Sequence, residues 1–431
     1  MMKELQTCVK LLSYVSVVPL CLFFKVGYGG ESNTYARIHV EAGEISGEDS
    51  ILAVKLPPAS LPPGAVFVIK EMESGRILPA QRHPENPQRI DFRLDGPFPA
   101  GEDRTYLLKK SDVPPVSHLR QLDDGNGLVL KVSDQEVLRY NYRPYPNKPW
   151  EGPSSPPVAR ERSGNIHPVR SPQGQILSEV FPDGRGHHLG VWGAWVNTRY
   201  KDRSYDFWNL QTPDEKELVE FDHWIWKQAE GPVFTGFKAA QSHTLMLDGE
   251  KTPVLSETLE LRVYPGDEGI FFDYTVEQEW LMDTPLILNA HVYGGVMSWR
   301  YPATWESGSG LAVSSEGEVQ RLGGDQSADA TRARWLKVHG TEAGQTAGFL
   351  IMSHPENFRH PEPLRILDDG PAKGGYVHFT PIRNEGWQLN KREHHTYRYR
   401  VFVYDGTIAP AKAEQLWQQF AWKPKISVSS H

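Results

Sequence analysis

The sequence predicts an all-β protein: a small N-terminal β-sandwich module, a large antiparallel β-sandwich (super-sandwich-like) and one C-terminal helix. Two observations favour this fold class. Runs with a two-residue hydrophobic period recur along the chain, and 38 Gly and 34 Pro separate them among 431 residues. Because Gly and Pro favour turns and interrupt helices, we expect many strands and few long helices.

The first thirty residues are typical of a secretory signal peptide. Lys3 and Lys10 supply positive charge, the apolar stretch 11–24 follows, and the small residues Gly27, Gly29 and Gly30 come next. A membrane span needs ~20 apolar residues, and this stretch is shorter. We therefore expect a secreted or periplasmic protein with no transmembrane span in the mature chain.

The mature chain is expected to contain no cysteine, because Cys8 and Cys21 both lie within residues 1–30. This excludes disulfides, thiolate metal ligands and a cysteine nucleophile. The formal net charge is -8, and the sequence has no long basic run. The composition therefore predicts no nucleic-acid partner.

Residues 31–115 are predicted to form the small β-sandwich module. Short runs of β-forming residues alternate with Pro and Gly clusters there, a pattern typical of antiparallel sandwiches. The expected strands are 36–40, 50–55, 66–71, 89–94 and 105–109. The Pro-containing segment 111–116 is expected to link this module to the next part of the chain.

Residues 116–425 are predicted to form the large sandwich, and residues 426–431 a tail. Three segments alternate apolar and polar positions, which indicates half-buried antiparallel strands. These segments are 258–263, 270–277 and 397–404. The segments 144–157, rich in Pro, and 307–329, polar and rich in Gly, are expected to be long loops.

One helix is predicted, over Pro410 to Ala421. Proline suits the first turn of a helix, where its missing N–H would be unpaired in any case. Leu416, Trp417 and Phe420 then form an apolar stripe with helical spacing. This helix follows the last predicted strand and is expected to pack on a sheet.

The distribution of histidine gives the main functional hypothesis, because imidazole is the usual general base near neutral pH. His187 and His188 are the central candidates for acid/base catalysis, with His167 and Tyr293 assisting. Neighbouring residues on a strand point to opposite faces, so the pair shares a site only if the backbone bends at Asp183 to Gly186. The alternative is that one histidine is a core residue whose ring bonds to the backbone.

No cofactor is predicted from motifs, since the sequence contains no H-x-H, no H-E-x-x-H and no cysteine ligand pattern. Three histidines from different loops could still bind a divalent metal such as Zn, Cu or Ca. His167, His187 and His188 are the residues expected to do so. Nucleotide-binding and esterase signatures are also missing.

Several aromatic and polar residues are candidates for substrate binding. Trp192 and Trp208 lie beside turns, with Asp206 near the second, and an indole face can stack on a sugar ring. The other Trp residues are expected in the core. Guanidinium, imidazole and amide groups that could hold hydroxyl or carboxylate groups occur at Arg300, Arg334, His354, Asn357 and His360. The alternative for the arginines is a surface ion pair.

The run 163–195 resembles the hallmark of the PmoA-like family, exported bacterial proteins labelled "methane oxygenase PmoA" whose function is largely unknown. Further matches follow in order and extend the resemblance over roughly 117–421. The matching positions include His167, Pro168, Ser171, Pro172, Gly174, His187, His188, Gly190, Trp192, 206–208, 293–295, 333–335, 354–357, 360–361 and the closing strand. One departure is Leu189, which replaces the usual Arg and bears on specificity if that Arg contacts substrate.

The large sandwich is similar in pattern to the super-sandwich of aldose epimerases, polysaccharide lyases and hydrolases. Three functions follow as hypotheses. The first is an exported carbohydrate-active enzyme, a hydrolase or lyase rather than an epimerase, with a histidine-centred acid/base site. The second is a carbohydrate-binding surface protein without turnover, and the third is a histidine-ligated metal oxygenase or hydrolase. A carbohydrate or small molecule is the expected partner in the first two.

Overall fold

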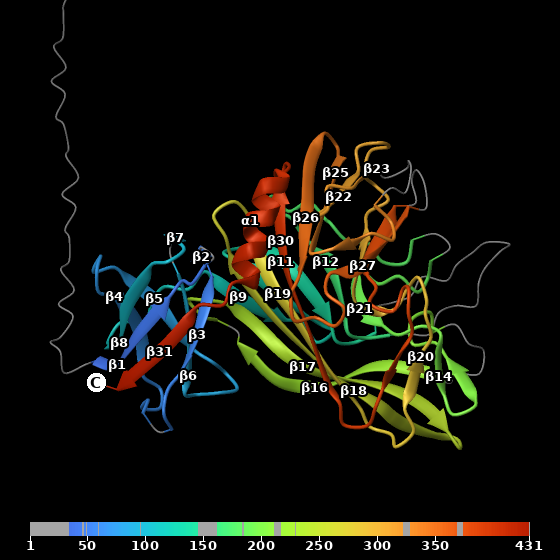
Figure 1. Cartoon of the computed structure of the whole chain (residues 1–431), viewed down its shortest axis with the longest axis horizontal. Coiled ribbons are helices and arrows are strands. Elements are labelled where there is room, and N and C mark those ends of the chain that lie inside the picture. The colour runs from blue at the N-terminus through green and yellow to red at the C-terminus, as the bar shows by residue number, and fades with distance from the viewer. Residues whose placement is uncertain are drawn as a thin grey trace, which may run out of the picture. The chain divides into compact units, whose positions relative to one another are not determined.

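Two nine-stranded antiparallel sheets build the large part of the molecule (Figure 1). The computed structural model describes residues 34–44, 47–48, 50–58, 60–94, 96–144, 162–182, 185–210, 217–228, 230–321, 328–368 and 374–430. The predicted signal peptide, the Pro-rich segment 145–157 and the bend at 183–184 lie outside these residues. The all-β fold class is confirmed.

The first large sheet has the strand order β24-β27-β28-β21-β13-β12-β11-β10-β9. Its central strands come from distant parts of the sequence. The sheet is therefore complete only when strands far apart along the chain have paired. The strands are β9 (Leu119–Asp123), β10 (Gly127–Val132), β11 (Gln135–Asn141), β12 (Asn165–Val169), β13 (Val191–Ala194), β21 (Gly295–Tyr301), β24 (Arg332–Ala333), β27 (Glu362–Asp368) and β28 (Gly375–Phe379).

The second large sheet has the order β16-β17-β18-β19-β30-β26-β25-β22-β23. The three alternating segments predicted from the sequence all lie in it. The strands are β16 (Glu217–Gln228), β17 (Thr235–Leu247), β18 (Glu250–Pro265), β19 (Ile270–Trp280), β22 (Leu311–Ser314), β23 (Val319–Arg321), β25 (Trp335–Glu342), β26 (Gln345–Ser353) and β30 (His394–Asp405). The expected loop 307–329 is therefore wrong in part, because β22 and β23 form a hairpin within it.

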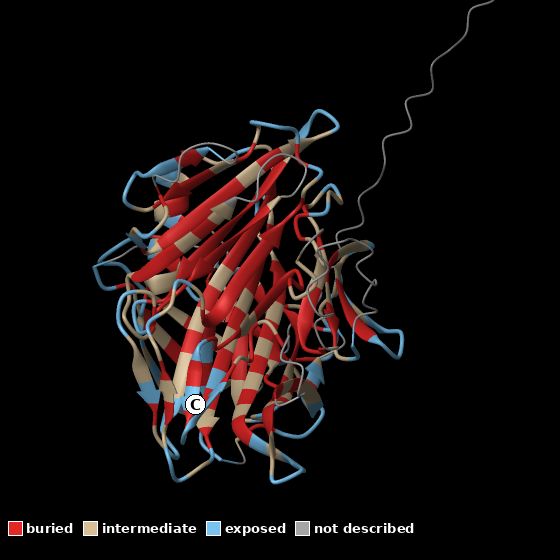
Figure 2. Cartoon of the chain, turned by 90° about the vertical axis from the view of Figure 1, so that its right-hand side faces the viewer, coloured by how far each residue is buried: buried red, intermediate tan, exposed pale blue. Residues whose placement is uncertain are grey.

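The core of the large part lies between these two sheets. Trp299 of β21 stacks on Phe349 of β26 with ring centroids 4.0 Å apart, and it also faces Phe272 of β19. Figure 2 shows buried residues running along the strands of both sheets, with exposed residues mainly in the loops. Burial of apolar surface is the main favourable contribution to folding. It matters all the more here because no disulfide is expected in the mature chain.

A third, four-stranded sheet lies beside the large ones and has the order β15-β14-β20-β29. Its strands are short and carry the loops that surround the candidate site. They are β14 (Thr198–Tyr200), β15 (Arg203–Tyr205), β20 (Leu286–Leu288) and β29 (Trp387–Leu389).

The N-terminal module is a seven-stranded sheet, β3-β6-β5-β4-β8-β1-β31, with its own apolar core, and a two-stranded sheet joins β2 to β7. Its strands are β1 (Thr34–Glu41), β2 (Gly47–Glu48), β3 (Ile51–Lys55), β4 (Val66–Glu71), β5 (Ile77–Arg82), β6 (Arg89–Arg93), β7 (Pro97–Phe98), β8 (Asp103–Ser111) and β31 (Lys425–Ser430).

The C-terminal residues correct one prediction. Residues 426–431 were expected to be a tail, but β31 pairs antiparallel with β1 along six residue pairs. Trp422 inserts into the module's core beside Phe98. The module therefore contains both ends of the described chain, and Thr34–His431 forms one compact unit.

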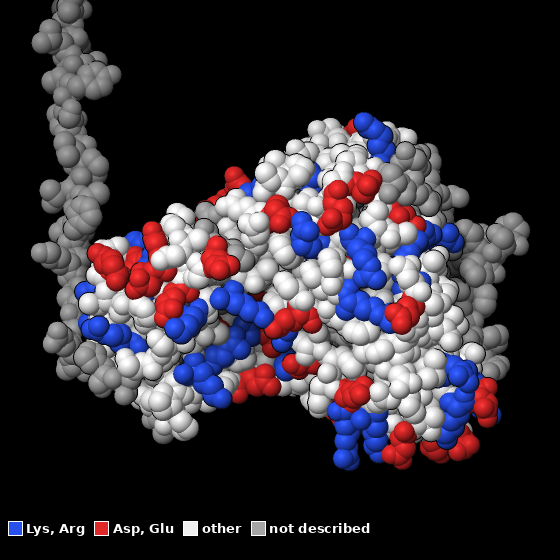
Figure 3. All heavy atoms as spheres, viewed as in Figure 1, with Lys and Arg blue, Asp and Glu red and all other residues white. Residues whose placement is uncertain are grey.

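The predicted helix is confirmed as α1 (Pro410–Ala421), with Pro410 in its first turn. It lies against β25 and β26 of the second sheet (Figure 1). Within the described residues, no helix has the length and apolar character needed to cross a membrane. On the face drawn in Figure 3, acidic and basic side chains are interspersed rather than separated into a single basic stripe.

Candidate functional site

Strand alternation places several predicted residues on one face of the first large sheet. Trp192 of β13 lies opposite Ser298 of β21, Ser298 lies opposite His378 of β28, and His378 lies opposite Arg365 of β27. Directly opposed residues in antiparallel strands share a face. The intervening Trp299 points to the inter-sheet core, so this row lies on the outer face of the sheet.

The outer face is buried beneath loops. All seven residues of β21 are buried, although only alternate ones face the inter-sheet core. The His188 ring lies 5.2 Å from Trp192, and Trp208 lies 5.0 Å from Trp192 and 4.9 Å from His378. Trp192 and Trp208 are therefore buried against protein rings and do not offer an open platform to solvent.

His188 is held as a neutral hydrogen-bond acceptor. Its Nδ1 lies 3.2 Å from a terminal nitrogen of Arg300, whose side chain is fully buried. Burial, with the adjacent His187 and Arg300, lowers the pKa of His188 well below its ordinary value. His187 is half-buried, and its ring meets His188 edge-on at 4.5 Å. The pair thus lies together, but His188 is committed to the guanidinium.

His167 is also neutral near pH 7. Its Nδ1 lies 2.9 Å from the Ser178 hydroxyl, and burial lowers its pKa to about 4. Among the described residues, no three His, Cys, Asp or Glu side chains are grouped as metal ligands. His167, His187 and His188, the set expected from the sequence, therefore do not form such a group there.

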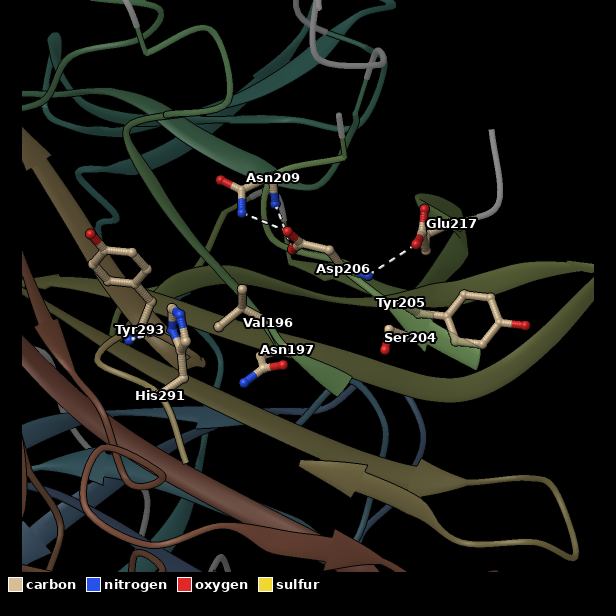
Figure 4. A pocket seen from close by; sticks show the side chains of 9 residues that line it. All are labelled: Val196, Asn197, Ser204, Tyr205, Asp206, Asn209, Glu217, His291 and Tyr293. Carbon is tan, nitrogen blue, oxygen red and sulfur yellow. Dashed lines mark hydrogen bonds between the residues drawn. The ribbon is translucent and has the colours of Figure 1, made fainter. Parts of the chain in front are cut away.

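A pocket of about 550 Å³ adjoins the buried face (Figure 4). It is lined by residues from the segment between β13 and β14, from β15 and the segment that follows it, from the start of β16, and from the loop between β20 and β21. These residues are Val196, Asn197, Ser204, Tyr205, Asp206, Asn209, Glu217, His291 and Tyr293. Two of the predicted site residues, Asp206 and Tyr293, therefore line it.

Asp206 is fixed at the pocket by the turn that follows it. Its Oδ1 accepts hydrogen bonds from the backbone N–H groups of Trp208 and Asn209, each at 3.0 Å. Its Oδ2 accepts a bond from the Asn209 side-chain amide at 2.6 Å. The Asp206 N–H in turn donates to Glu217 at 3.0 Å (Figure 4). The carboxylate is consequently oriented before any ligand binds.

His291 and Tyr293 share one loop, which the backbone fixes at both ends. The His291 N–H donates to the carbonyl of Ile382 at 3.1 Å. Gly294 and Gly295 follow Tyr293 with φ of 107° and 152°, and a side chain at Gly295 would lie 2.7 Å from the Phe379 carbonyl. Only glycine tolerates this conformation and this approach.

The tautomer of His291 follows from its contacts. The Tyr293 N–H donates to His291 Nδ1 at 3.2 Å, so a neutral ring carries its proton on Nε2. Burial lowers the pKa of His291, and the Asp206 carboxylate offsets part of that effect. His291 can therefore donate a hydrogen bond from Nε2 to a ligand in the pocket.

Tyr293 connects the pocket with the buried face. Its ring is nearly parallel to Trp208 with centroids 6.3 Å apart, and it lies 5.7 Å from Tyr376 of β28. Behind it, several buried polar atoms have no hydrogen-bond partner among the described residues. They are Trp192 Nε1, Ser298 Oγ, Thr380 Oγ1 and both ring nitrogens of His378. Buried polar groups are rarely left unpaired, so these atoms retain hydrogen-bonding capacity that solvent or a ligand can fill.

Four predicted residues lie elsewhere, in a second group that we call the α1-side cluster: Arg334, His354, Asn357 and His360. Arg334 pairs with Glu414 of α1 and covers Trp417, while His360 stacks on the same indole. Asn357 and Ser353 donate hydrogen bonds to buried Glu362. None of these four residues lines the pocket described above.

Sequence reasoning missed His291, Asn209 and Glu217 as pocket residues, and His378 on the buried face. His291 could have been predicted, because it lies two residues before Tyr293 in the segment that leads to Gly294 and Gly295. Asn209 could have been found as the end of an Asp-initiated turn. Nothing local marks Glu217 or His378, since their neighbours come from other strands.

No curated protein matches the chain in sequence. Similar solved structures include an alpha-mannosidase from Enterococcus faecalis V583 (TM-score 0.48, 10% identity, 93% of this chain and 46% of that one). A heparan sulfate lyase HepC mutant from Pedobacter heparinus gives TM-score 0.32, 10% identity and coverage of 70% and 38%. A putative aldose 1-epimerase from Klebsiella pneumoniae subsp. pneumoniae MGH 78578 gives TM-score 0.31 and 10% identity. The match covers 87% of this chain and 97% of that one.

The chain spans about half the length of the mannosidase structure that it matches. Family membership is clearer, because a family model covers the large sandwich from β10 into α1. That model, described as a family of unknown function, matches residues 127–418. The chain therefore belongs to the DUF6807 family.

Proposed function

We propose that the chain is a carbohydrate-active enzyme that hydrolyses a bond to an uncharged sugar unit held in the pocket. The observation that carries this proposal is the convergence of three different groups on one cavity: the Asp206 carboxylate, the neutral His291 ring and the Tyr293 hydroxyl. Together they supply a proton acceptor, a hydrogen-bond donor and a proton donor, and an aromatic ring forms part of the wall.

The charge of the pocket favours an uncharged sugar over a uronate. Among the described residues, its lining includes Asp206 and Glu217 but no Lys or Arg. An anionic sugar would be repelled there, and elimination beside a carboxylate requires that the carboxylate be neutralised by a cation or protonated donor. The same arrangement therefore favours hydrolysis over the lyase reaction.

Each group has a defined role in this proposal. Tyr293 donates its hydroxyl proton to the leaving glycosidic oxygen as the bond to the anomeric carbon breaks. Asp206 accepts a proton from the water that forms the new bond to that carbon. The proton then returns from Asp206 to Tyr293 through solvent, while His291 Nε2–H holds a sugar oxygen in place.

The test is a product screen by mass spectrometry. Purified protein is incubated with uncharged gluco-, manno-, galacto- and xylo-oligosaccharides and, separately, with uronate-containing oligosaccharides. We expect products carrying one added water from an uncharged substrate. Asp206→Asn and His291→Ala should abolish these products, whereas His394→Ala, which alters an exposed histidine, should not.

Three outcomes would overturn the proposal. Unsaturated products from a uronate substrate would assign elimination in place of hydrolysis. Sugar binding measured by calorimetry, with no product in the whole panel, would assign a binding protein without turnover. A His187→Ala, His188→Ala double variant that folds but loses activity would return the catalytic role to the histidine pair predicted from sequence.

A further inference from the structure

Two arginines near Tyr293 share a single carboxylate, and we call Arg365, Arg383 and Asp329 the arginine cluster. Asp329 accepts a hydrogen bond from Arg365 Nη1 at 2.8 Å and two from Arg383, at 2.9 and 3.1 Å. All three side chains are largely buried, with exposed fractions of 14% for Arg365, 11% for Arg383 and 10% for Asp329. Within the part of the chain that the structure describes, Asp329 is the only acid ion-paired with either arginine. The cluster therefore carries an excess positive charge.

Hydrogen-bond donors beside Arg365 are unpaired. Arg365 Nε and Thr380 Oγ1 are buried without a hydrogen-bond partner among the described residues, and so are both ring nitrogens of His378. His378 lies directly opposite Arg365 in the register of β27 and β28. Thr380 follows two residues later, and its N–H continues the ladder by donating to the Pro363 carbonyl at 2.7 Å. Because alternate residues of a strand share a face, these donors are neighbours with capacity for an anionic partner.

The arginine cluster lies next to the pocket. The Arg365 guanidinium is 5.8 Å from the centre of the Tyr293 ring, and Tyr293 is one of the residues that line the pocket. Trp208, which stacks on His378 with centroids 4.9 Å apart, is also nearly parallel to the Tyr293 ring. A pocket with an acidic lining therefore has a positively charged group beside it, and the two suit sugar units of different charge.

We propose that the arginine cluster binds the carboxylate of an acidic sugar unit joined to the uncharged unit in the pocket. This inference rests on the proposed function, which places the uncharged unit there. The Arg365 Nε–H and the Thr380 hydroxyl donate to the carboxylate, whose negative charge offsets the excess charge of the cluster. Repulsion from Asp206 and Glu217 keeps the acidic unit out of the pocket itself. The substrate class is thus a mixed oligosaccharide in which an acidic and an uncharged unit are adjacent.

The test measures binding and needs no turnover. Disaccharides of glucuronate joined to xylose, galactose or mannose are titrated into the full chain by isothermal calorimetry. Each is compared with its carboxyl methyl ester, which has the same units without the charge. We expect at least one acid to bind about tenfold more tightly than its ester at low salt, the factor for one charge-assisted hydrogen bond. This preference should shrink as the salt concentration is raised, because Arg365 is partly exposed.

Three variants assign the preference to this site. Arg365→Gln should abolish the difference in affinity between acid and ester, whereas Arg365→Lys keeps the charge without the Nε–H and should retain part of it. Thr380→Val preserves the branched shape of the side chain, removes the hydroxyl and should lower the ratio of the two affinities about threefold. Lys425→Gln removes an exposed charge from β31 and is the matched control, whose ratio should equal that of wild type.

Equal affinity for acid and ester in every pair overturns the inference, and so does a preference that persists in folded Arg365→Gln. Failure of all the acidic disaccharides to bind counts equally against it. If an acid is preferred but mass spectrometry finds no hydrolysis, the proposed function fails and the carboxylate site stands. If uncharged oligosaccharides are hydrolysed and no acid is preferred, hydrolysis stands and the carboxylate site fails.

Discussion

The face beside the pocket and the α1-side cluster both contain residues predicted from the sequence to bind substrate. Their buried polar groups differ in how many hydrogen-bond partners they have. At the α1-side cluster, Glu362 accepts bonds from Ser353, Tyr399 and Asn357, and Trp417 donates to the Ser353 carbonyl. At the pocket face, both nitrogens of His378 and the Ser298 hydroxyl lack partners among the described residues. Bonds such as those to Glu362 stabilise a fold, and unpaired groups leave capacity for a ligand.

The first prediction addresses the largest difference between the two regions. Tyr293→Phe should lower the rate of sugar hydrolysis by roughly 10²-fold, the usual contribution of a general acid, because it removes the proton and little else. Its thermal unfolding should match that of wild type. Tyr35→Phe is the matched control, and equal activity of the two variants would remove Tyr293 from the chemistry.

At the α1-side cluster the expected effect is on stability. Asn357→Ala should lower the free energy of unfolding by about 3 kcal/mol, because it leaves the Arg398 N–H without its side-chain partner and removes one hydrogen bond each from the Arg398 carbonyl and Glu362. Chemical denaturation measures this loss, and sugar binding in the folded variant should be normal. The half-exposed Asn390→Ala is the control. Lost binding with intact stability would place the pocket function at this cluster.

Protonation of Glu362 should make the free energy of unfolding depend on pH, an effect that arises at the α1-side cluster and not at the pocket face. Burial raises its pKa from 4.5 to about 7. A raised carboxyl pKa means that the folded state holds the proton between these values, so its contribution to stability is lost as pH rises from 4.5 to 7. Relative to Glu362→Gln, wild type should lose about 3 kcal/mol over that range. Denaturation of both proteins at pH 4.5 and pH 8 tests this, and a constant difference would contradict it.

The smallest expected effect is a gain. His378→Phe keeps a ring against Trp208 but removes two buried nitrogens that lack partners in the described chain. It should raise the free energy of unfolding by about 1 kcal/mol. A loss of similar size in denaturation would show that a solvent molecule pairs with the imidazole in solution, and the contrast between the two regions would then be weaker.

Local pattern was sufficient for the elements that depend on local chemistry. The alternation in 270–277 and 397–404 predicted β19 and β30, because a strand on a sheet with one apolar face repeats every two residues. Proline at 410 and the apolar stripe after it predicted α1. Two residues of the run 163–195, His188 and Trp192, are in contact on the buried face beside the pocket.

Tertiary structure decided which side chains meet. Residues 426–431 looked like a tail because nothing near them in sequence shows that β1 is their partner. His291 of the β20–β21 loop and Glu217 of β16 line one pocket, while Arg334 pairs with Glu414 of α1 and Asn357 bonds to Arg398 of β30. The sequence by itself determined strand periodicity, which is local. Strand order, and with it the site, depends on pairing between residues far apart in the chain, which local pattern does not encode.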